Sequence, residues 1–300
     1  MPAETLLLAE DALAFDFAPA AAGARTFVGS RSSVMAYVAA IRAVPLGAQP
    51  LQREGVTASF DPLEQDPAMA QALSRAQWNA NQVVGHLDTL HRWSSGSVRE
   101  LAAEVLKPIV AMRDAIAAVP SGGTLSPEAD RDTLMNMMMA RVWTSQIAAG
   151  VDLVRRGLHS FLTNLRDDHD TLASGSIAIG AIRSRIQQHT SEVAQRYILG
   201  PEFMRWAGAL VLDIGRARLE ALAGVENAIV RALEGHQGMR GGMDAFASGA
   251  ESIGAKYAAA QGALASADAP TRSMALRKYD FNRAIRSWED FRDFILQAGF

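Results

Sequence analysis

The side chains best suited to hold a metal ion lie together at residues 167–170, in the order Asp-Asp-His-Asp. Carboxylate and imidazole groups are common metal ligands. The apolar repeat around them predicts a helix, however, and neighbouring positions on a helix point about 100° apart. Four consecutive side chains then do not converge on one ion. We interpret these residues as a solvated helix end and expect no metal site.

Other catalytic or cofactor motifs are absent from the sequence. Asp88 and His91 can share a helix face, but a di-iron bundle needs Glu-x-x-His twice, and the chain has none. Gly235, Gly238, Gly241 and Gly242 lack the lysine and the spacing of a phosphate-binding loop, and they favour a bend. Cysteine is absent, which excludes disulfides and thiolate chemistry. We expect no catalytic residues and no cofactor.

A long apolar repeat is the dominant feature of the chain. Eleven positions from 137 to 172 alternate by three and four residues, without an intervening proline, so they keep one side of a helix facing a partner. These positions are Met137, Ala140, Thr144, Ile147, Val151, Val154, Leu158, Phe161, Leu165, Asp168 and Leu172. A helix of this length predicts an elongated bundle.

The composition agrees with an all-α fold. Hydrophobic residues make up 49% of the 300 residues, many of them alanine, which is the best helix former. The net charge of −3 gives no nucleic-acid footprint. Basic and acidic residues alternate, as at Arg216, Arg218 and Glu220, which is typical of a solvated helix face.

The sequence contains no run of 18 apolar residues and therefore no predicted membrane span. It also shows no signal peptide at its N-terminus. We therefore expect a protein that is made soluble in the cytoplasm.

Turn signals divide the chain into an N-terminal region, 1–66, and a bundle, 67–300. The first region comprises an arm, a short helix at 27–44 and an extended connection from Pro45 to Pro67. In the bundle we expect four to five long antiparallel helices. The long helices are expected at 67–119, 127–172 and 202–234, with a bend at 235–242 and further helices to 300. A small head or capping segment is expected at about 173–205.

Two groups of residues suggest contact surfaces. Four methionines, at 135 and 137–139, fit core packing near the end of a helical hairpin, and otherwise an exposed tip for a partner or lipid. The segment 174–212 combines apolar patches with aromatic residues, which suits a membrane interface. The expected contact residues there are Ile177, Ile179, Ile182, Tyr197, Phe203 and Trp206. Gly175 and Gly200 are the expected hinges. Replacing Ile179 with Asp is expected to abolish the contact.

This layout resembles the α-helical pore-forming toxins, the family of cytolysin A and of the xenorhabdolysin-type binary toxins. The matching parts are the hairpin 67–172, the head at 173–205 and the long helices from 202 onward. Local similarities are Leu90-His-Arg-Trp-Ser-Ser-Gly-Ser97 and Ala284-x-x-x-Trp288-x-x-Phe291. The head lacks the long apolar hairpin that inserts in cytolysin A. The resemblance therefore fits the less hydrophobic partner of a multi-component toxin.

The resemblance implies a soluble, non-enzymatic toxin component that is released or secreted, associates with target-cell membranes and oligomerises. Its partners would be the target membrane, a second toxin component, or both, and no nucleic acid. Two alternatives remain open. One is a structural or scaffolding bundle that acts through protein–protein contacts. The other is a helical bundle that carries a ligand or has enzymatic activity in an internal cavity.

Overall fold

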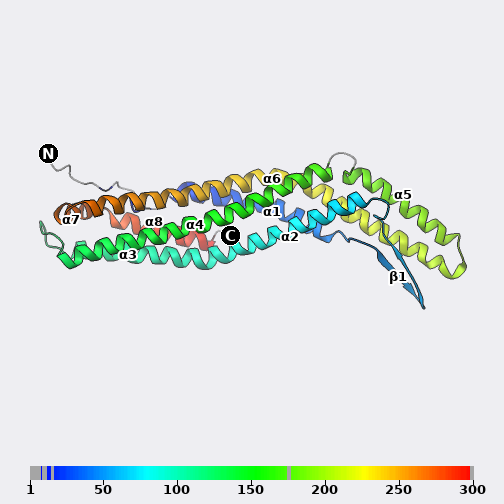
Figure 1. Ribbon diagram of the computed structural model, residues 1–300, viewed down its shortest axis with the longest axis horizontal. Coiled ribbons are helices and arrows are strands. Elements are labelled where there is room, and N and C mark those ends of the chain that lie inside the picture. The colour runs from blue at the N-terminus through cyan, green and yellow to red at the C-terminus, as the bar shows by residue number, and fades with distance from the viewer. Residues whose placement is uncertain (1–7, 9–11, 15–16, 174–176, 298–300) are drawn as a thin grey trace. The chain divides into compact units, whose positions relative to one another are not determined.

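The computed structural model describes residues 8, 12–14, 17–173 and 177–297, and almost all of them are helical (Figure 1). Two short strands and two single-turn segments, of π type at Trp93–Val98 and of 3₁₀ type at Glu202–Met204, complete the order of elements. The helices are α1 Phe17–Ala43, α2 Pro67–Arg92, α3 Arg99–Ala117, α4 Pro127–Ala173, α5 Ile179–Ile198, α6 Arg205–Ser266, α7 Ala269–Lys278 and α8 Phe281–Gln297.

The chain folds into two compact units, and each is built from separate stretches of sequence. Unit 1 comprises Met1–Val28, His86–Gly157 and Gly241–Phe300. Unit 2 comprises Gly29–Gly85 and Leu158–Arg240. The division at residue 66 that the turn signals suggest stays a prediction. The long helices α4 and α6, of 47 and 62 residues, each contribute residues to both units.

The repeat from 137 to 172 is confirmed as the buried side of α4. All eleven positions are buried, and the most exposed of them, Val154, shows only 8% of its surface. The predicted helix starts are confirmed as well. The Ser126 hydroxyl accepts from the Ala129 amide at 3.2 Å, and an Asp66 carboxylate oxygen accepts from the Met69 amide at 3.1 Å. Both side chains satisfy amides that a helix start leaves without an intrahelical partner.

The extended connection predicted for 45–67 is instead a β-hairpin. Strands β1, Gln49–Arg53, and β2, Val56–Phe60, pair in antiparallel register, with Arg53 opposite Val56. The two residues between them have positive φ, 47° at Glu54 and 85° at Gly55. A two-residue turn with this backbone matches the twist of the flanking strands. The fold class stays all-α because this hairpin is the only sheet among the described residues.

The bend predicted at the glycines 235–242 is wrong, because α6 continues through all of them to Ser266. Gly235 and Gly242 permit close packing against α1. A Cβ atom at Gly242 would lie 2.7 Å from the Phe27 amide nitrogen and would also meet the carbonyl oxygen of Gly23. A Cβ atom at Gly235 would lie 2.9 Å from the Ser30 carbonyl oxygen. Glycine is needed because the two backbones approach more closely than a side chain permits. Helix α1 also begins ten residues earlier than the short helix predicted at 27–44.

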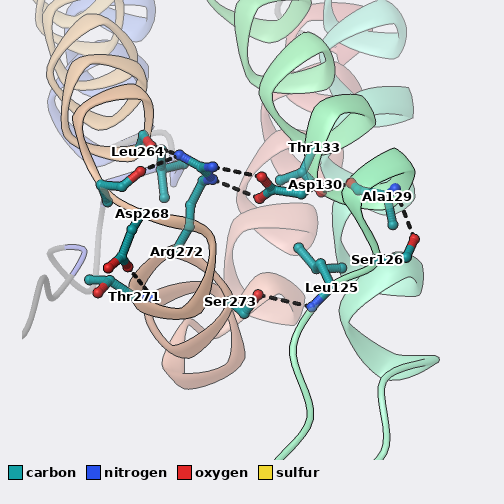
Figure 2. Close-up of polar contacts among 11 residues, drawn as sticks. Leu125, Ser126, Ala129, Asp130, Thr133, Leu264, Asp268, Thr271, Arg272 and Ser273 are labelled. Carbon is teal, nitrogen blue, oxygen red and sulfur yellow. Dashed lines mark hydrogen bonds and ion pairs between the residues drawn. The ribbon is translucent and has the colours of Figure 1, made fainter.

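Buried polar contacts join distant segments of unit 1. The Leu13 carbonyl accepts hydrogen bonds from the Tyr257 hydroxyl at 2.8 Å and from the Trp288 indole at 3.1 Å. At the α6–α7 turn, the Arg272 guanidinium donates to both carboxylate oxygens of Asp130, at 2.7 and 2.6 Å, and to the Leu264 carbonyl (Figure 2). This bidentate ion pair joins α7 to the first turn of α4 and is strong because it is buried and fully hydrogen-bonded.

Unit 2 contains a buried carboxylate that links three helices. Asp168 on α4 is 1% exposed and accepts from the Asn79 amide of α2 at 3.0 Å. The Tyr37 hydroxyl of α1 donates to it at 3.4 Å, and the Arg75 guanidinium lies 3.8 Å away. Burial raises the pKa of Asp168, and the contacts with Asn79, Arg75 and Tyr37 offset only part of that rise. The prediction of a solvated helix end is therefore wrong for Asp168.

Replacing Gly242 with Leu should lower the free energy of unfolding by about 1–3 kcal/mol, because the added atoms collide with the backbone of α1. Chemical denaturation followed by circular dichroism measures the change. Gly241→Ala is the matched control, since a Cβ atom at Gly241 meets nothing within 4 Å. Equal stability of the two variants would contradict the close approach of α1 and α6.

Asp168→Asn should weaken the dependence of stability on pH. A carboxyl whose pKa is raised by folding favours the native state below its unfolded pKa of about 4, and that contribution is lost as the pH rises through the folded pKa. The variant lacks this titration, so its stability should decline less than that of the original chain above about pH 4. Urea denaturation across pH 3–8 tests this, and parallel curves for the two proteins would refute it.

Candidate membrane and partner contact site

The structure divides the predicted contact residues into a buried and an accessible group. Ile179 and Ile182 face the core of unit 2 from α5 and are 1% and 0% exposed. They offer no surface in this conformation, and Ile179→Asp would place a charge in the core. Ile177 is half-buried, and Gly175 lies outside the described residues.

The accessible group surrounds the end of α5 and the start of α6. Phe203 is 65% exposed, whereas Tyr197 and Trp206 are half-buried and pack against the hairpin. Gly200 lies in the turn itself, where its amide donates to the Tyr197 carbonyl at 3.3 Å. Figure 1 shows this turn as the connection between the neighbouring helices α5 and α6.

Two neighbours of Tyr197 expose more apolar surface than most of the predicted residues. Ile198 is 47% exposed and Leu199 is 86% exposed. Together with Phe203 they are exposed at the α5–α6 turn, and these three residues are here named the turn patch. The sequence carried a signal for this exposure. Gly200-Pro201 ends a helix, and the two apolar residues directly before it lie at the helix end, where a neighbouring helix covers them less. Arg196 and Arg205 are exposed next to them.

The β-hairpin covers the helices beside the turn patch. Leu51 and Phe60 are its buried side chains, and they pack with Ala194 of α5 and with Ala207 and Val211 of α6. A groove of about 360 Å³ lies between the hairpin turn and the start of α6, and it is lined by Arg53, Glu54, Val56, Glu202, Phe203 and Trp206. Phe203 thus belongs both to this groove and to the turn patch.

The hairpin also covers polar groups that are only partly paired. Arg218 of α6 is 1% exposed, which corrects the prediction of a solvated side chain, and it donates to the Gly47 carbonyl at 3.2 Å. Burial lowers the pKa of Arg218, and the charge of Asp61 opposes that effect. The His189 ring lies 5.5 Å from the Phe60 ring, and neither of its nitrogens has a hydrogen-bond partner among the described residues. Such groups cost free energy when they are buried.

Ion pairs attach α5 to its neighbours within unit 2. The Arg183 guanidinium lies 2.9 Å from the Glu226 carboxylate of α6. The Arg185 guanidinium lies 2.7 Å from the carboxylate of Asp66, which precedes α2. Both arginines are at least one-third exposed, so each pair contributes modestly and is weakened by salt.

The structure also places the other candidate residues. The described residues include no group of three or more His, Asp or Glu side chains that could hold a metal ion. Among the methionines, Met137 is buried as core packing requires, whereas Met135, Met138 and Met139 are 51%, 43% and 41% exposed. No helix of the described chain has the length and apolar content to cross a membrane.

Comparison with known proteins gives similarity at the level of structure only. No family model and no curated protein matches the chain. Among solved structures, the HblL1 toxin component of Bacillus cereus matches with a TM-score of 0.53 and 10% identity, over 96% of this chain and 97% of that one.

Two further matches have lower scores. Soluble SmhB, of the tripartite alpha-pore forming toxin Smh from Serratia marcescens, matches with a TM-score of 0.43 and 11% identity over 93% of this chain and 91% of its own. XaxA from Xenorhabdus nematophila matches with a TM-score of 0.36 and 9% identity, over 91% of this chain and 95% of that one. The predicted resemblance is confirmed for the fold: the chain has the fold of the HblL1 toxin component.

Proposed function

We propose that this chain is a non-enzymatic component of an α-helical pore-forming toxin, which associates with membranes and oligomerises. The observation that carries this proposal is the fold shared with the HblL1 toxin component over nearly the full length of both chains. Fold alone does not give function, so the contact surface has to supply the rest of the argument.

The turn patch is the surface best suited to meet a membrane. Leu199 and Phe203 expose most of their surface at the α5–α6 turn, and the exposed Arg196 and Arg205 flank them. Apolar and aromatic side chains gain free energy in the boundary region of a bilayer, while arginines interact with anionic headgroups. In this proposal the turn patch makes the first contact.

The buried residues of α5 contribute in a later step. Ile179 and Ile182 reach lipid or a second toxin component only after α5 leaves the core, and Gly200 and Gly175 are the proposed hinges for that change. Arg218, which is only partly paired, and His189, which has no hydrogen-bond partner among the described residues, support it, because their burial makes this packing less stable than a fully satisfied core. In this proposal the protein is released from its cell and acts on a target membrane.

Leu199→Asp and Phe203→Asp should each weaken binding to lipid vesicles by roughly tenfold or more, since an apolar side chain of this size contributes about 2 kcal/mol on burial. Flotation with vesicles of mixed phosphatidylcholine and phosphatidylserine measures binding, and circular dichroism verifies that the helices persist. Val230→Asp is the matched control, because Val230 is an exposed apolar residue of α6 in the same unit, at 51%.

Two outcomes would contradict the proposed contact. One is a loss of binding in Val230→Asp as large as that in Leu199→Asp, which would indicate a general effect of negative charge. The other is an original chain that never floats with vesicles, which would remove the membrane role and favour the scaffolding alternative.

A further inference from the structure

Helix α4 exposes a second apolar side within unit 1, in addition to its buried one. We name this surface the exposed α4 stripe. Met135, the adjacent pair Met138 and Met139, and Val142 follow one another at helical spacing, and Gln146 and Ala149 continue the line to Leu153 in steps of four, three and four residues. The exposed fractions are 51% for Met135, 43% for Met138, 41% for Met139, 46% for Val142 and 64% for Leu153.

A periodic stripe is the surface that one long helix presents to another. Its regularity distinguishes it from apolar side chains scattered over a surface, which need no explanation. The opposite side of α4 is already covered within the chain. No described helix of this chain covers the exposed α4 stripe, so the stripe is open to a helix of another molecule.

Helix α6 of the same unit carries a surface of complementary shape. Eight exposed residues follow one another at steps of four and three, and all of them are Gly, Ala or Ser: Gly241, Ala245, Ser248, Ser252, Ala255, Ala259, Gly262 and Ser266. We name this surface the α6 small-residue face. A groove of about 320 Å³ runs beside it, and Pro19, Ala245, Ser248, Gly249, Ser252, Ile253 and Lys256 line it.

Two glycines of this face make no close packing contact among the described residues. A Cβ atom at Gly241 or at Gly262 would meet nothing within 4 Å. Glycine inside a helix costs about 1 kcal/mol relative to alanine. The glycines of α6 that face α1 offset this cost through close packing, whereas Gly241 and Gly262 leave room for a helix of another molecule to approach closely.

One pair of opposite charges stands at the ends of the two surfaces. Within unit 1, α4 and α6 run antiparallel, with Arg141 bonded to Gln261 and Arg155 lying 3.8 Å from Asp244. A second copy rotated about an axis parallel to these helices keeps this register. It then brings the exposed Arg131, before the stripe, to the exposed Asp268, after the small-residue face.

We infer that the exposed α4 stripe of one copy docks on the α6 small-residue face of a second copy of this chain. The contact joins two different surfaces, so it repeats from copy to copy and closes into a ring when the rotation permits. The stripe has far fewer residues than the roughly 20–30 a side of a stable complex. Copies therefore join only where they are concentrated, and the inference rests on the proposed function for the membrane that concentrates them.

Single cysteines test this contact cleanly, because the chain has none of its own. Val142→Cys and Ala259→Cys chains, each His-tagged, are mixed on vesicles that carry a nickel-chelating lipid and are treated with a short bismaleimide. The tag holds the copies at the surface whether or not the turn patch binds lipid. The mixture should give at least about tenfold more covalent dimer than either chain alone, because docking raises the effective concentration of the two thiols.

Controls separate docking from crowding. Ala111→Cys, at an exposed position of α3, replaces Val142→Cys in a parallel mixture and should give only background dimer. Adding Met138→Glu to the Val142→Cys chain should abolish the product, and it leaves the fold intact because Met138 is exposed. Dimers from the Val142→Cys chain alone would show that two α4 stripes meet and would overturn the inference.

The inference and the proposed function fail separately. Release of a dye from vesicles without the Val142–Ala259 product would overturn the docking contact and leave the toxin role standing. The covalent product without dye release, alone or with any second component, would support the docking contact and count against the toxin role.

Discussion

The structure depends on one packing constraint: a helix with an unbroken apolar side has to be covered along its entire length. In α4 that side runs through eleven consecutive repeat positions, all of them buried. The covering segments come from different parts of the chain, since Tyr37 of α1 and Asn79 of α2 meet Asp168 near one end of it. Other elements pack closely on the long helices as well. Helix α1 approaches α6 at Gly23 and Gly242, and the backbone bonds of Leu13 hold the start of the chain in unit 1.

Periodicity was the part of the sequence that predicted structure best, because burial of one helix side depends on spacing and hardly on the identity of the partner. Asp168 shows how strong this signal is. Its charge suggested solvent, and its place in the repeat indicated the core. The repeat was right, because Asn79 and Arg75 supply polar contacts that no local pattern reveals. No repeat indicated the burial of Arg218: an alternation of charges suggested a solvated face, and the Gly47 carbonyl and the hairpin cover it instead.

Glycine and proline were harder to interpret, since they can interrupt a helix or permit a close contact. At residues 235–242 the glycines were expected to bend the chain, yet α6 is unbroken there, and Gly235 and Gly242 allow α1 to pack against it. At Glu54-Gly55 the opposite error occurred: a two-residue turn signal lay inside a segment whose prolines suggested an open connection. Only Leu51 and Phe60 of that hairpin are buried, so its alternation was too short to identify from sequence. Leu199 was missed among the contact residues for a similar reason, because its exposure depends on where α5 ends.

The two exposed apolar surfaces differ in a way that bears on what each can bind. The turn patch has no helical period, since Ile198, Leu199 and Phe203 come from two elements and a turn. A lipid boundary imposes no register, so an irregular cluster is sufficient there. The exposed α4 stripe keeps a regular period from Met135 to Leu153, and only a partner with its own period benefits from that regularity. The α6 small-residue face has the same period and the opposite bulk. In the proposed function, the irregular patch therefore suits contact with the membrane, and the periodic stripe suits contact with a neighbouring copy.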